Sequence, residues 1–140
     1  MDHLLQYLSH HGVAAALAVA TALAVLLYEA WLRLQNAAAV APQEAIRLMN
    51  QGATVLDIRT SQAYAEGHIN GARHLEAAQI PTAGDALKRF KERTLIVYCD
   101  RGALAPSAVR TLSRQGFTKV VNLRGGLAAW RSENLPLARG

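Results

Sequence analysis

The stretch TLIVYCDRGALAPS, residues 94–107, decides the fold of this chain. It begins with Thr94–Tyr98, where β-branched and apolar residues follow one another without polar alternation, as in a strand buried on both faces of a parallel sheet. Cys99 follows directly, and a short loop containing Gly102 leads to Pro106, a residue suited to the first turn of a helix. The pattern predicts a parallel α/β fold with Cys99 at the carboxyl end of a strand, where functional crevices lie.

The sequence on both sides of this stretch alternates between helix and strand patterns. Apolar stripes, β-branched runs and glycine punctuation mark the individual elements. They predict helices or helical turns at 42–52, 61–66, 84–90, 106–115 and 127–131, and strands at 54–58, 72–75, 94–98 and 119–123. This order predicts an open parallel sheet flanked by helices.

The N-terminal part of the chain has the length and apolarity of a membrane segment. Residues 3–28 contain no Asp, Glu, Lys or Arg. A helix needs about 20 apolar residues to cross a bilayer core, and residues 12–32 reach that length. Tyr28 and Trp31 lie where an interfacial aromatic belt would be. We therefore expect a transmembrane anchor at residues 1–35 that contacts lipid through residues 12–32, a linker at 36–41 and a folded domain at 42–140.

Two other interpretations of the apolar segment remain open. Ala37–Ala39 would suit the cleavage site of a signal peptide, but residues 1–10 lack the Lys or Arg of its positive region. A buried core helix would need a polar face, which this segment lacks. Because Arg33 and Arg47 follow the segment and no basic residue precedes it, the positive-inside rule predicts an outside N-terminus and a cytoplasmic domain.

Positive charge is spread over the domain rather than concentrated in one run. The chain carries a net charge of +5, and all 15 Lys and Arg residues lie at or after Arg33. They do not interleave with aromatic residues along a stripe, so nucleic acid is not an expected partner. A basic surface near anionic lipid headgroups explains the charge better.

Cys99 is the only cysteine, so a disulfide within the chain is impossible. A tight loop after the strand would direct backbone N–H groups at the thiol, and the next helix would add the positive end of its dipole. Both favour the nucleophilic thiolate, and Arg101 adds a positive charge nearby. Gly102 allows a backbone conformation that other residues avoid. On these residues alone, a reactive thiol and a buried structural cysteine are equally plausible interpretations.

Three blocks of sequence resemble the rhodanese-like family. The first is VLDIR at 55–59 with YAEGHINGA at 64–72, and the second is Cys99 with Gly102 three residues later. The third is the pair Gly116-Phe117 followed by Gly125-Gly126 and Trp130. Together the blocks cover residues 42–136. The closing residues 133–137 and the N-terminal segment are similar to the membrane-anchored, single-domain proteobacterial branch of that family, which implies the bacterial inner membrane.

The resemblance implies a rhodanese-like open parallel sheet and a sulfurtransferase activity. Cys99 would take sulfane sulfur from thiosulfate or a persulfide, and would pass it to a thiophilic acceptor such as a thiol. The family's active-site loop corresponds to Cys99, Asp100, Arg101, Gly102, Ala103 and Leu104, and Asp57 and Arg59 would form a supporting salt-bridged network beneath it. The resemblance implies no metal and no organic cofactor.

One residue departs from the family pattern. Leu104 stands where the family often has an arginine that would bind an anionic donor. Thiosulfate is therefore expected to be a poor donor, and a persulfide a better one. The alternative hypothesis is a weakly active or inactive rhodanese-like module that binds or regulates other membrane proteins.

Overall fold

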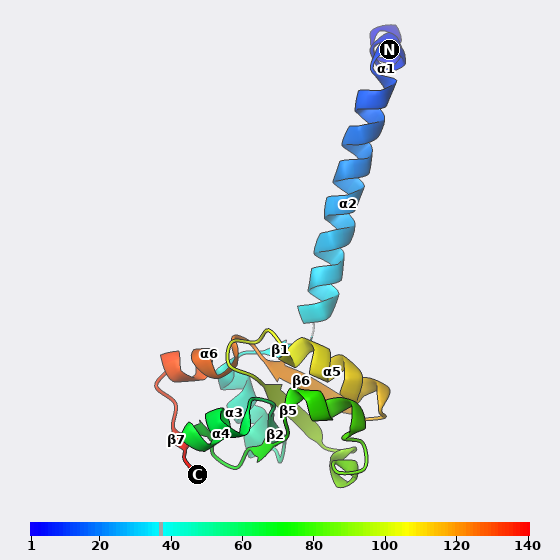
Figure 1. Cartoon of the computed structure of the whole chain (residues 1–140). Coiled ribbons are helices and arrows are strands. Elements are labelled where there is room, and N and C mark those ends of the chain that lie inside the picture. The colour runs from blue at the N-terminus through cyan, green and yellow to red at the C-terminus, as the bar shows by residue number, and fades with distance from the viewer. Residues whose placement is uncertain (37) are drawn as a thin grey trace. The chain divides into compact units, whose positions relative to one another are not determined.

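The computed structural model describes residues 1–36 and 38–140, with the side chains of residues 8 and 34–36 left aside. The chain divides into two compact units, Met1–Ala37 and Ala38–Gly140. The first unit contains the helices α1 (Asp2–His10) and α2 (Gly12–Asn36) (Figure 1). Within α2, Gly12–Arg33 is a 22-residue stretch with a mean hydropathy of 2.0, and none of it is buried. The predicted long apolar helix is thus confirmed, and by length and composition it could cross a membrane.

The second unit is built on a five-stranded parallel sheet, as the sequence predicts. The strands lie in the order β1-β6-β5-β2-β4, and every neighbouring pair is parallel. Their bounds are β1 Ala39–Val40, β2 Thr54–Asp57, β4 Arg73–His74, β5 Thr94–Tyr98 and β6 Lys119–Leu123. The central strand β5 pairs with β2 on one side and β6 on the other, so the residue after its carboxyl end lies in the middle of the sheet edge.

Helices cover both faces of this sheet and give it two cores (Figure 1). On one face, α5 (Ala105–Arg114) packs with the 3-10 segments η1 (Ala77–Thr82) and η2 (Lys88–Phe90). On the other face lie α3 (Pro42–Asn50), α4 (Ser61–Glu66) and α6 (Gly126–Ser132). Because side chains alternate along a strand, Leu95, Val97 and Cys99 enter the first core, while Ile96 and Tyr98 enter the second.

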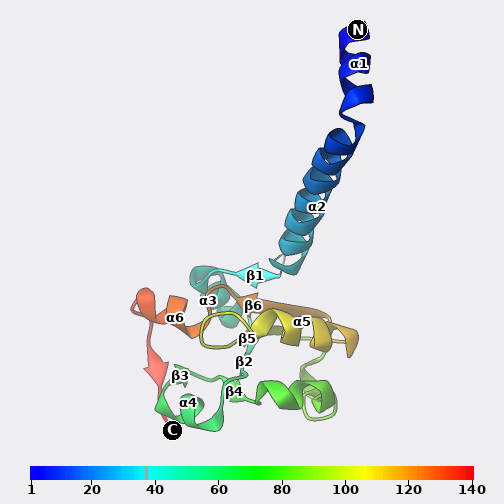
Figure 2. The same ribbon diagram turned by 45° about the horizontal axis from the view of Figure 1, so that its top comes forward.

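A second, two-stranded sheet was not predicted. β3 (His68–Ile69) pairs antiparallel with β7 (Leu137–Ala138), and Figure 2 shows them side by side next to α4. β3 and β7 have two residues each, too few for a hydrophobic period, whereas the equally short β4 lies within the strand predicted at 72–75.

Two predicted segments differ from the structure. The helix expected at 84–90 is reduced to the 3-10 turn η2, because a seven-residue stretch that follows Pro81 and begins with Gly84 cannot easily nucleate an α-helix. The expected linker at 36–41 includes a strand: Ala39 and Val40 pair with Asn122 and Leu123 of β6. The sheet therefore begins before the predicted domain boundary at residue 42. The part of that linker at Ala37 lies outside the described residues.

Candidate active site

Cys99 follows β5 directly and begins the loop that leads to α5. Its side chain is buried, and the backbone N–H of Gly102 donates a hydrogen bond to its Sγ atom at 3.2 Å. Gly102 has a φ of +89°, which a residue with a side chain rarely adopts. The loop thus turns back on itself, and one of its backbone N–H groups faces the thiol.

Backbone hydrogen bonds join the start of α6 to this loop. The N–H of Leu127 donates to the carbonyl oxygen of Cys99 at 2.9 Å, and the N–H of Ala128 donates to that of Asp100 at 2.9 Å. Gly126 has a φ of +60°, and a Cβ atom there would collide with the Cys99 carbonyl oxygen and lie 2.8 Å from the Arg101 nitrogen. The sequence identified Gly125-Gly126 only as part of a closing helix motif. Its second glycine lets two backbone segments meet under the cysteine loop.

A buried ion pair lies beside the loop. The Arg59 guanidinium donates to the Asp57 carboxylate, with Nη2 at 2.7 Å from Oδ2, and also to the carbonyl oxygen of Gly67 at 2.6 Å. Arg59 Nη1 lies 3.5 Å from Asp100 Oδ1, which connects the pair to the cysteine loop. Burial opposes the charged guanidinium, but the hydrogen bond and charge of Asp57 outweigh it and raise the pKa of Arg59. The expected network of Asp57 and Arg59 is therefore present.

Tyr98 completes this network and was not anticipated. Its hydroxyl donates to Asp57 Oδ2 at 2.6 Å and accepts from the N–H of Ile69 at 3.1 Å. Burial, together with the hydrogen bond donated to Asp57, raises the pKa of Tyr98 well above its usual value. Tyr98 thus ties the carboxylate under the loop to the second sheet through β3.

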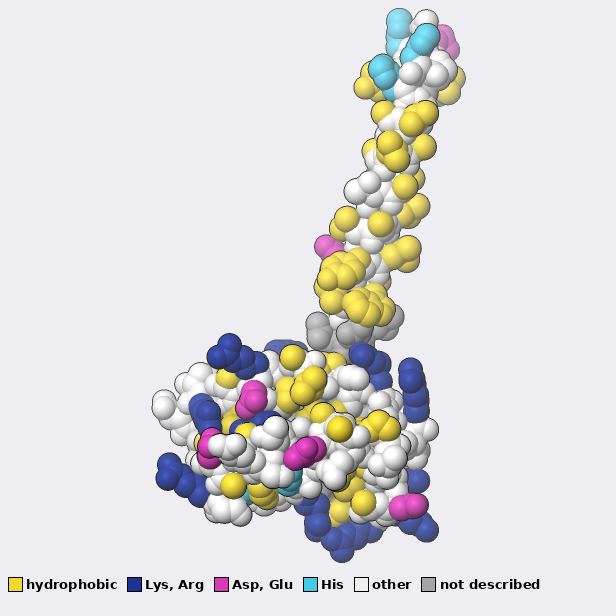
Figure 3. All heavy atoms as spheres, viewed as in Figure 1, with side chains coloured by type: hydrophobic (Ala, Val, Ile, Leu, Met, Phe, Trp, Pro, Cys, Tyr) yellow, Lys and Arg dark blue, Asp and Glu magenta, His cyan; other side chains and the backbone are white. Residues whose placement is uncertain are grey.

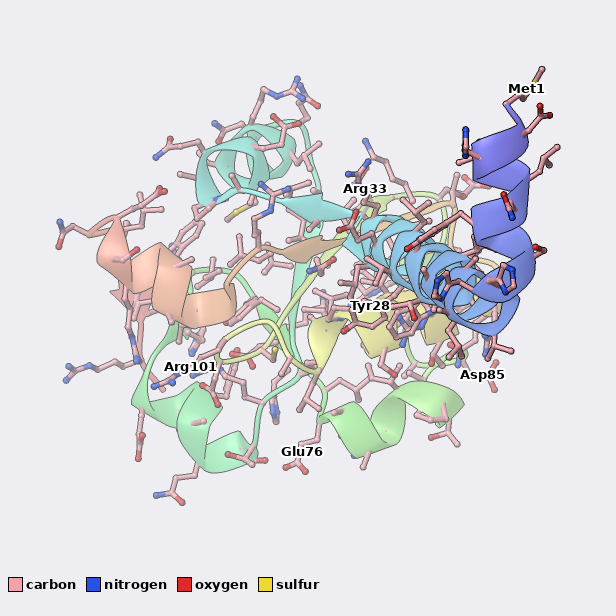
Figure 4. The ribbon with its side chains drawn as sticks, turned by 90° about the horizontal axis from the view of Figure 1, so that it is seen from above. Met1, Tyr28, Arg33, Glu76, Asp85 and Arg101 are labelled. Carbon is pink, nitrogen blue, oxygen red and sulfur yellow. The ribbon has the colours of Figure 1, made fainter. Side chains whose placement is uncertain are left out.

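The thiol lies on the wall of a cavity of about 520 Å³. The residues that line it are Ile58, Arg59, Thr60, Glu76, Ala77, Ala78, Cys99, Asp100, Arg101, Ala103 and Leu104. Figure 4 labels two of them, Arg101 on the loop after β5 and Glu76 on the segment after β4. Of the predicted site residues, Gly102 and Asp57 support the loop and do not line the cavity.

Glu76 lines the cavity as well and was not predicted as a site residue. Its carboxylate accepts hydrogen bonds from the N–H of Ser61 at 3.3 Å and the hydroxyl of Ser61 at 3.0 Å, which hold it at the start of η1. It reaches the cavity only through the pairing of β4 with β2, so no local pattern could have placed it beside Cys99.

Comparisons with known proteins agree on one family. Residues 41–133 match the model of the rhodanese-like domain. The thiosulfate sulfurtransferase GlpE of Stutzerimonas stutzeri is 38% identical over 95 residues, covering 66% of this chain and 83% of that protein. The uncharacterised protein YibN of Escherichia coli is 30% identical over 142 residues, covering 100% of this chain and 99% of that protein.

Solved structures show the same fold. The Alr3790 protein from Anabaena superposes with a TM-score of 0.64 at 30% identity, covering 72% of this chain and 82% of that chain. A rhodanese-related protein from Thermoplasma volcanium superposes with a TM-score of 0.66 at 22% identity, covering 73% of this chain and 98% of that chain. The family match and these similarities agree with the sheet order and the cysteine loop, and the chain belongs to the rhodanese-like family.

Proposed function

We propose that this chain is a membrane-tethered sulfurtransferase that carries sulfane sulfur as a persulfide on Cys99. The observation that carries the proposal is the position of the thiol. It lies at the carboxyl end of the central strand, on a cavity wall, with the Gly102 N–H 3.2 Å from its sulfur. The same chain is 38% identical to a thiosulfate sulfurtransferase over 95 residues.

The proposed reaction has two steps, each a displacement at sulfur. In the first, the Cys99 thiolate attacks the outer sulfur of the donor, and the donor's S–S bond breaks. Sulfite leaves if the donor is thiosulfate, and a thiolate leaves if it is a persulfide. In the second, an acceptor thiolate attacks the outer sulfur of the Cys99 persulfide, and the Cys99 thiolate leaves with the bonding electron pair. No external oxidant or reductant is needed.

The loop residues have separate roles in this proposal. The N–H of Gly102 stabilises negative charge on sulfur, since a backbone donor to an anion makes a strong hydrogen bond. Asp100, Arg101, Ala103 and Leu104 form the substrate-binding side of the loop. Asp57 and Arg59 act as positioning residues, because the paired Arg59 guanidinium contacts both Asp100 and the carbonyl oxygen of Gly67.

The proposed tether is α2. Its apolar stretch Gly12–Arg33 is long enough to span a bilayer core, and the similarity to YibN extends over this part of the chain. Arg33 and Arg47 on its carboxyl side favour a bacterial inner-membrane protein with an outside N-terminus and a cytoplasmic domain. A reducing cytoplasm would also keep the single thiol free.

Replacing the nucleophile tests this function. We expect Cys99→Ser to abolish sulfur transfer from any donor, because a hydroxyl has nearly the size of a thiol and far less nucleophilicity. The measurement is transfer by the detergent-solubilised full chain from thiosulfate and from a small persulfide, with thermal unfolding as the control for the fold. Normal transfer by a folded Cys99→Ser protein would refute the assignment.

Leu104 favours one alternative, a module that binds or regulates membrane proteins without strong activity. Leu104 is 55% exposed, lines the cavity and supplies no charge to hold an anionic donor. A folded wild-type chain that transfers sulfur from neither donor would favour this alternative.

A further inference from the structure

The charge around Cys99 is poorly suited to an anionic substrate. Four ionisable residues line the cavity beside the thiol, namely Arg59, Glu76, Asp100 and Arg101. The Arg59 guanidinium is already bound to the Asp57 carboxylate at 2.7 Å. The same guanidinium lies 3.5 Å from the Asp100 carboxylate, so its charge is shared between two carboxylates. Arg101 and Glu76 add one charge of each sign to the lining, so an anion that enters the cavity gains little net attraction.

The rest of the cavity wall is apolar. Ile58, Ala77, Ala78, Ala103 and Leu104 line it with the thiol. Leu104 is the one large hydrophobic side chain exposed among the described side chains of residues 38–140. Figure 3 shows hydrophobic side chains gathered on this face of the domain, around the loop after β5 and the start of α5, with acidic side chains beside them. Exposed apolar surface next to a reactive group is a common feature of small-molecule sites.

The stability of the fold does not explain a leucine at this position. Leu104 is the N-cap residue of α5 and makes no side-chain capping bond. Ser, Thr, Asp or Asn at an N-cap stabilises a helix relative to an apolar residue. Leucine here forgoes that stabilisation and exposes apolar surface to water, so its presence points to a contact that the domain makes with something else.

We propose that Leu104 and the apolar wall select, as the sulfur acceptor, a small uncharged thiol with an apolar body. This inference rests on the proposed function, since it requires a persulfide on Cys99. A cavity of about 520 Å³ has the size of a site for a small organic molecule. The apolar body of the acceptor lies against Ala77, Ala103 and Leu104, and its sulfur reaches the persulfide.

The transfer balances without a co-reactant. The acceptor thiol loses its proton to water, and its thiolate attacks the outer sulfur of the Cys99 persulfide. The S–S bond breaks, the Cys99 thiolate leaves with the electron pair, and the acceptor becomes a persulfide. One neutral sulfur atom is passed from Cys99 to the acceptor.

A series of acceptors with one thiol and a growing tail tests the selection. The full chain in detergent is first loaded with sulfur by incubation with inorganic polysulfide, and the excess polysulfide is removed. Intact mass then confirms that one sulfur atom has been added. The added mass is then followed as it is lost to 2-mercaptoethanol, 4-mercapto-1-butanol, 6-mercapto-1-hexanol or 2-mercaptoethanesulfonate. Each methylene buried against the wall raises the transfer rate by up to about fourfold, so we expect about tenfold or more between the two- and six-carbon alcohols. The sulfonate should be slower than the alcohol of equal length.

Three variants separate the side chain from general effects. Leu104→Ala should weaken the dependence of the transfer rate on tail length. Because detergent takes up the thiols equally in the wild-type and variant samples, any difference between them is due to residue 104. Leu104→Arg should turn the preference toward the sulfonate and lower the KM for thiosulfate as a donor. Ser107→Ala, an exposed change in α5 that lies outside the cavity, should keep the wild-type dependence.

Each contrary outcome has a distinct meaning. Equal rates for all tail lengths in the wild type, or an unchanged dependence in Leu104→Ala, would overturn the inference. Sulfur transfer from the Cys99 persulfide to a reduced protein thiol, but to none of the small thiols, would overturn the inference in favour of a protein acceptor. If polysulfide, thiosulfate and a small persulfide all add no sulfur to Cys99 in the folded chain, the proposed function itself fails and the inference falls with it.

Discussion

At the scale of single residues, the cysteine loop depends on glycines whose importance is invisible in their local sequence. The position of Gly102 was predictable, because a loop that turns back on a strand end needs a residue with positive φ. Gly126 was not, because its constraint comes from the carbonyl oxygen of Cys99, 27 positions away in the chain. A constraint between neighbours in the chain is visible in the sequence, whereas a contact between residues far apart in the chain is not.

A methyl group at Gly126 tests this contact. We expect Gly126→Ala to lower stability by about 2 kcal/mol or more and to reduce sulfur transfer strongly, because the new Cβ displaces the backbone of Cys99. Gly52→Ala is the matched control: Gly52 also has positive φ, at +99°, but a Cβ there meets nothing within 4 Å. It should lose about 1 kcal/mol and keep its activity. Equal losses of activity in the two variants, measured with chemical denaturation alongside, would show that strain and not contact is responsible.

At the scale of elements, the strands and helices with a full hydrophobic period were predictable, and among the short ones β4 and α4 were predicted while β1, β3, β7 and η1 were not. β5, β6, α3 and α5 agree with their predicted positions within about two residues, since each has an apolar stripe or a β-branched run. β3, β7 and η1 are stabilised by tertiary pairing and by side-chain caps such as the one formed by Glu76 and Gln79. The cysteine loop could therefore be predicted from the sequence, but the part of the cavity wall formed by η1 could not.

The link between β5, β2 and β3 through Tyr98 predicts a pH dependence of stability. In the folded chain the pKa of Tyr98 is raised, so the phenol stays neutral where an unfolded tyrosine, with a pKa near 10, ionises. The stabilisation due to Tyr98 is complete below pH 10 and is lost as pH rises above it, by up to about 1.4 kcal/mol per pH unit.

Tyr98→Phe isolates this contribution. At pH 7 we expect the variant to be less stable by about 2 kcal/mol, because it loses the hydrogen bond to the Asp57 carboxylate and leaves the Ile69 N–H without its acceptor. The two urea-derived free energies of unfolding should converge between pH 10 and pH 11. A constant difference across that range would contradict the assigned state of Tyr98.

At the scale of the whole molecule, the two units of the chain have opposite chemical character. The first holds a 22-residue stretch that is apolar and unburied, and the second is a sheet domain with its hydrophobic residues packed in two cores. Because none of the stretch Gly12–Arg33 is buried within the unit, a bilayer is its proposed environment. All 15 Lys and Arg residues of the chain lie at or after Arg33, so the positive charge begins where the apolar stretch ends.

This division predicts a topology that protease treatment can test. With an epitope tag after Gly140 in a bacterial host, the chain should sediment with the inner membrane, and the tag should resist protease in spheroplasts until detergent is added. Digestion of the tag in intact spheroplasts would place the domain outside and reverse the proposed orientation. Recovery in the soluble fraction after loss of residues 1–37 would instead indicate a cleaved signal peptide.

The most direct test of the central claim is the intact mass of the full chain after incubation with thiosulfate or a small persulfide, beside Cys99→Ser treated in the same way. We expect an added mass of one sulfur atom, about 32 Da, that a reducing thiol removes and that Cys99→Ser never acquires, because only a nucleophilic thiolate can accept it. An unchanged mass in a folded wild-type chain with every donor, or an equal adduct on Cys99→Ser, would show that Cys99 is not the sulfur carrier.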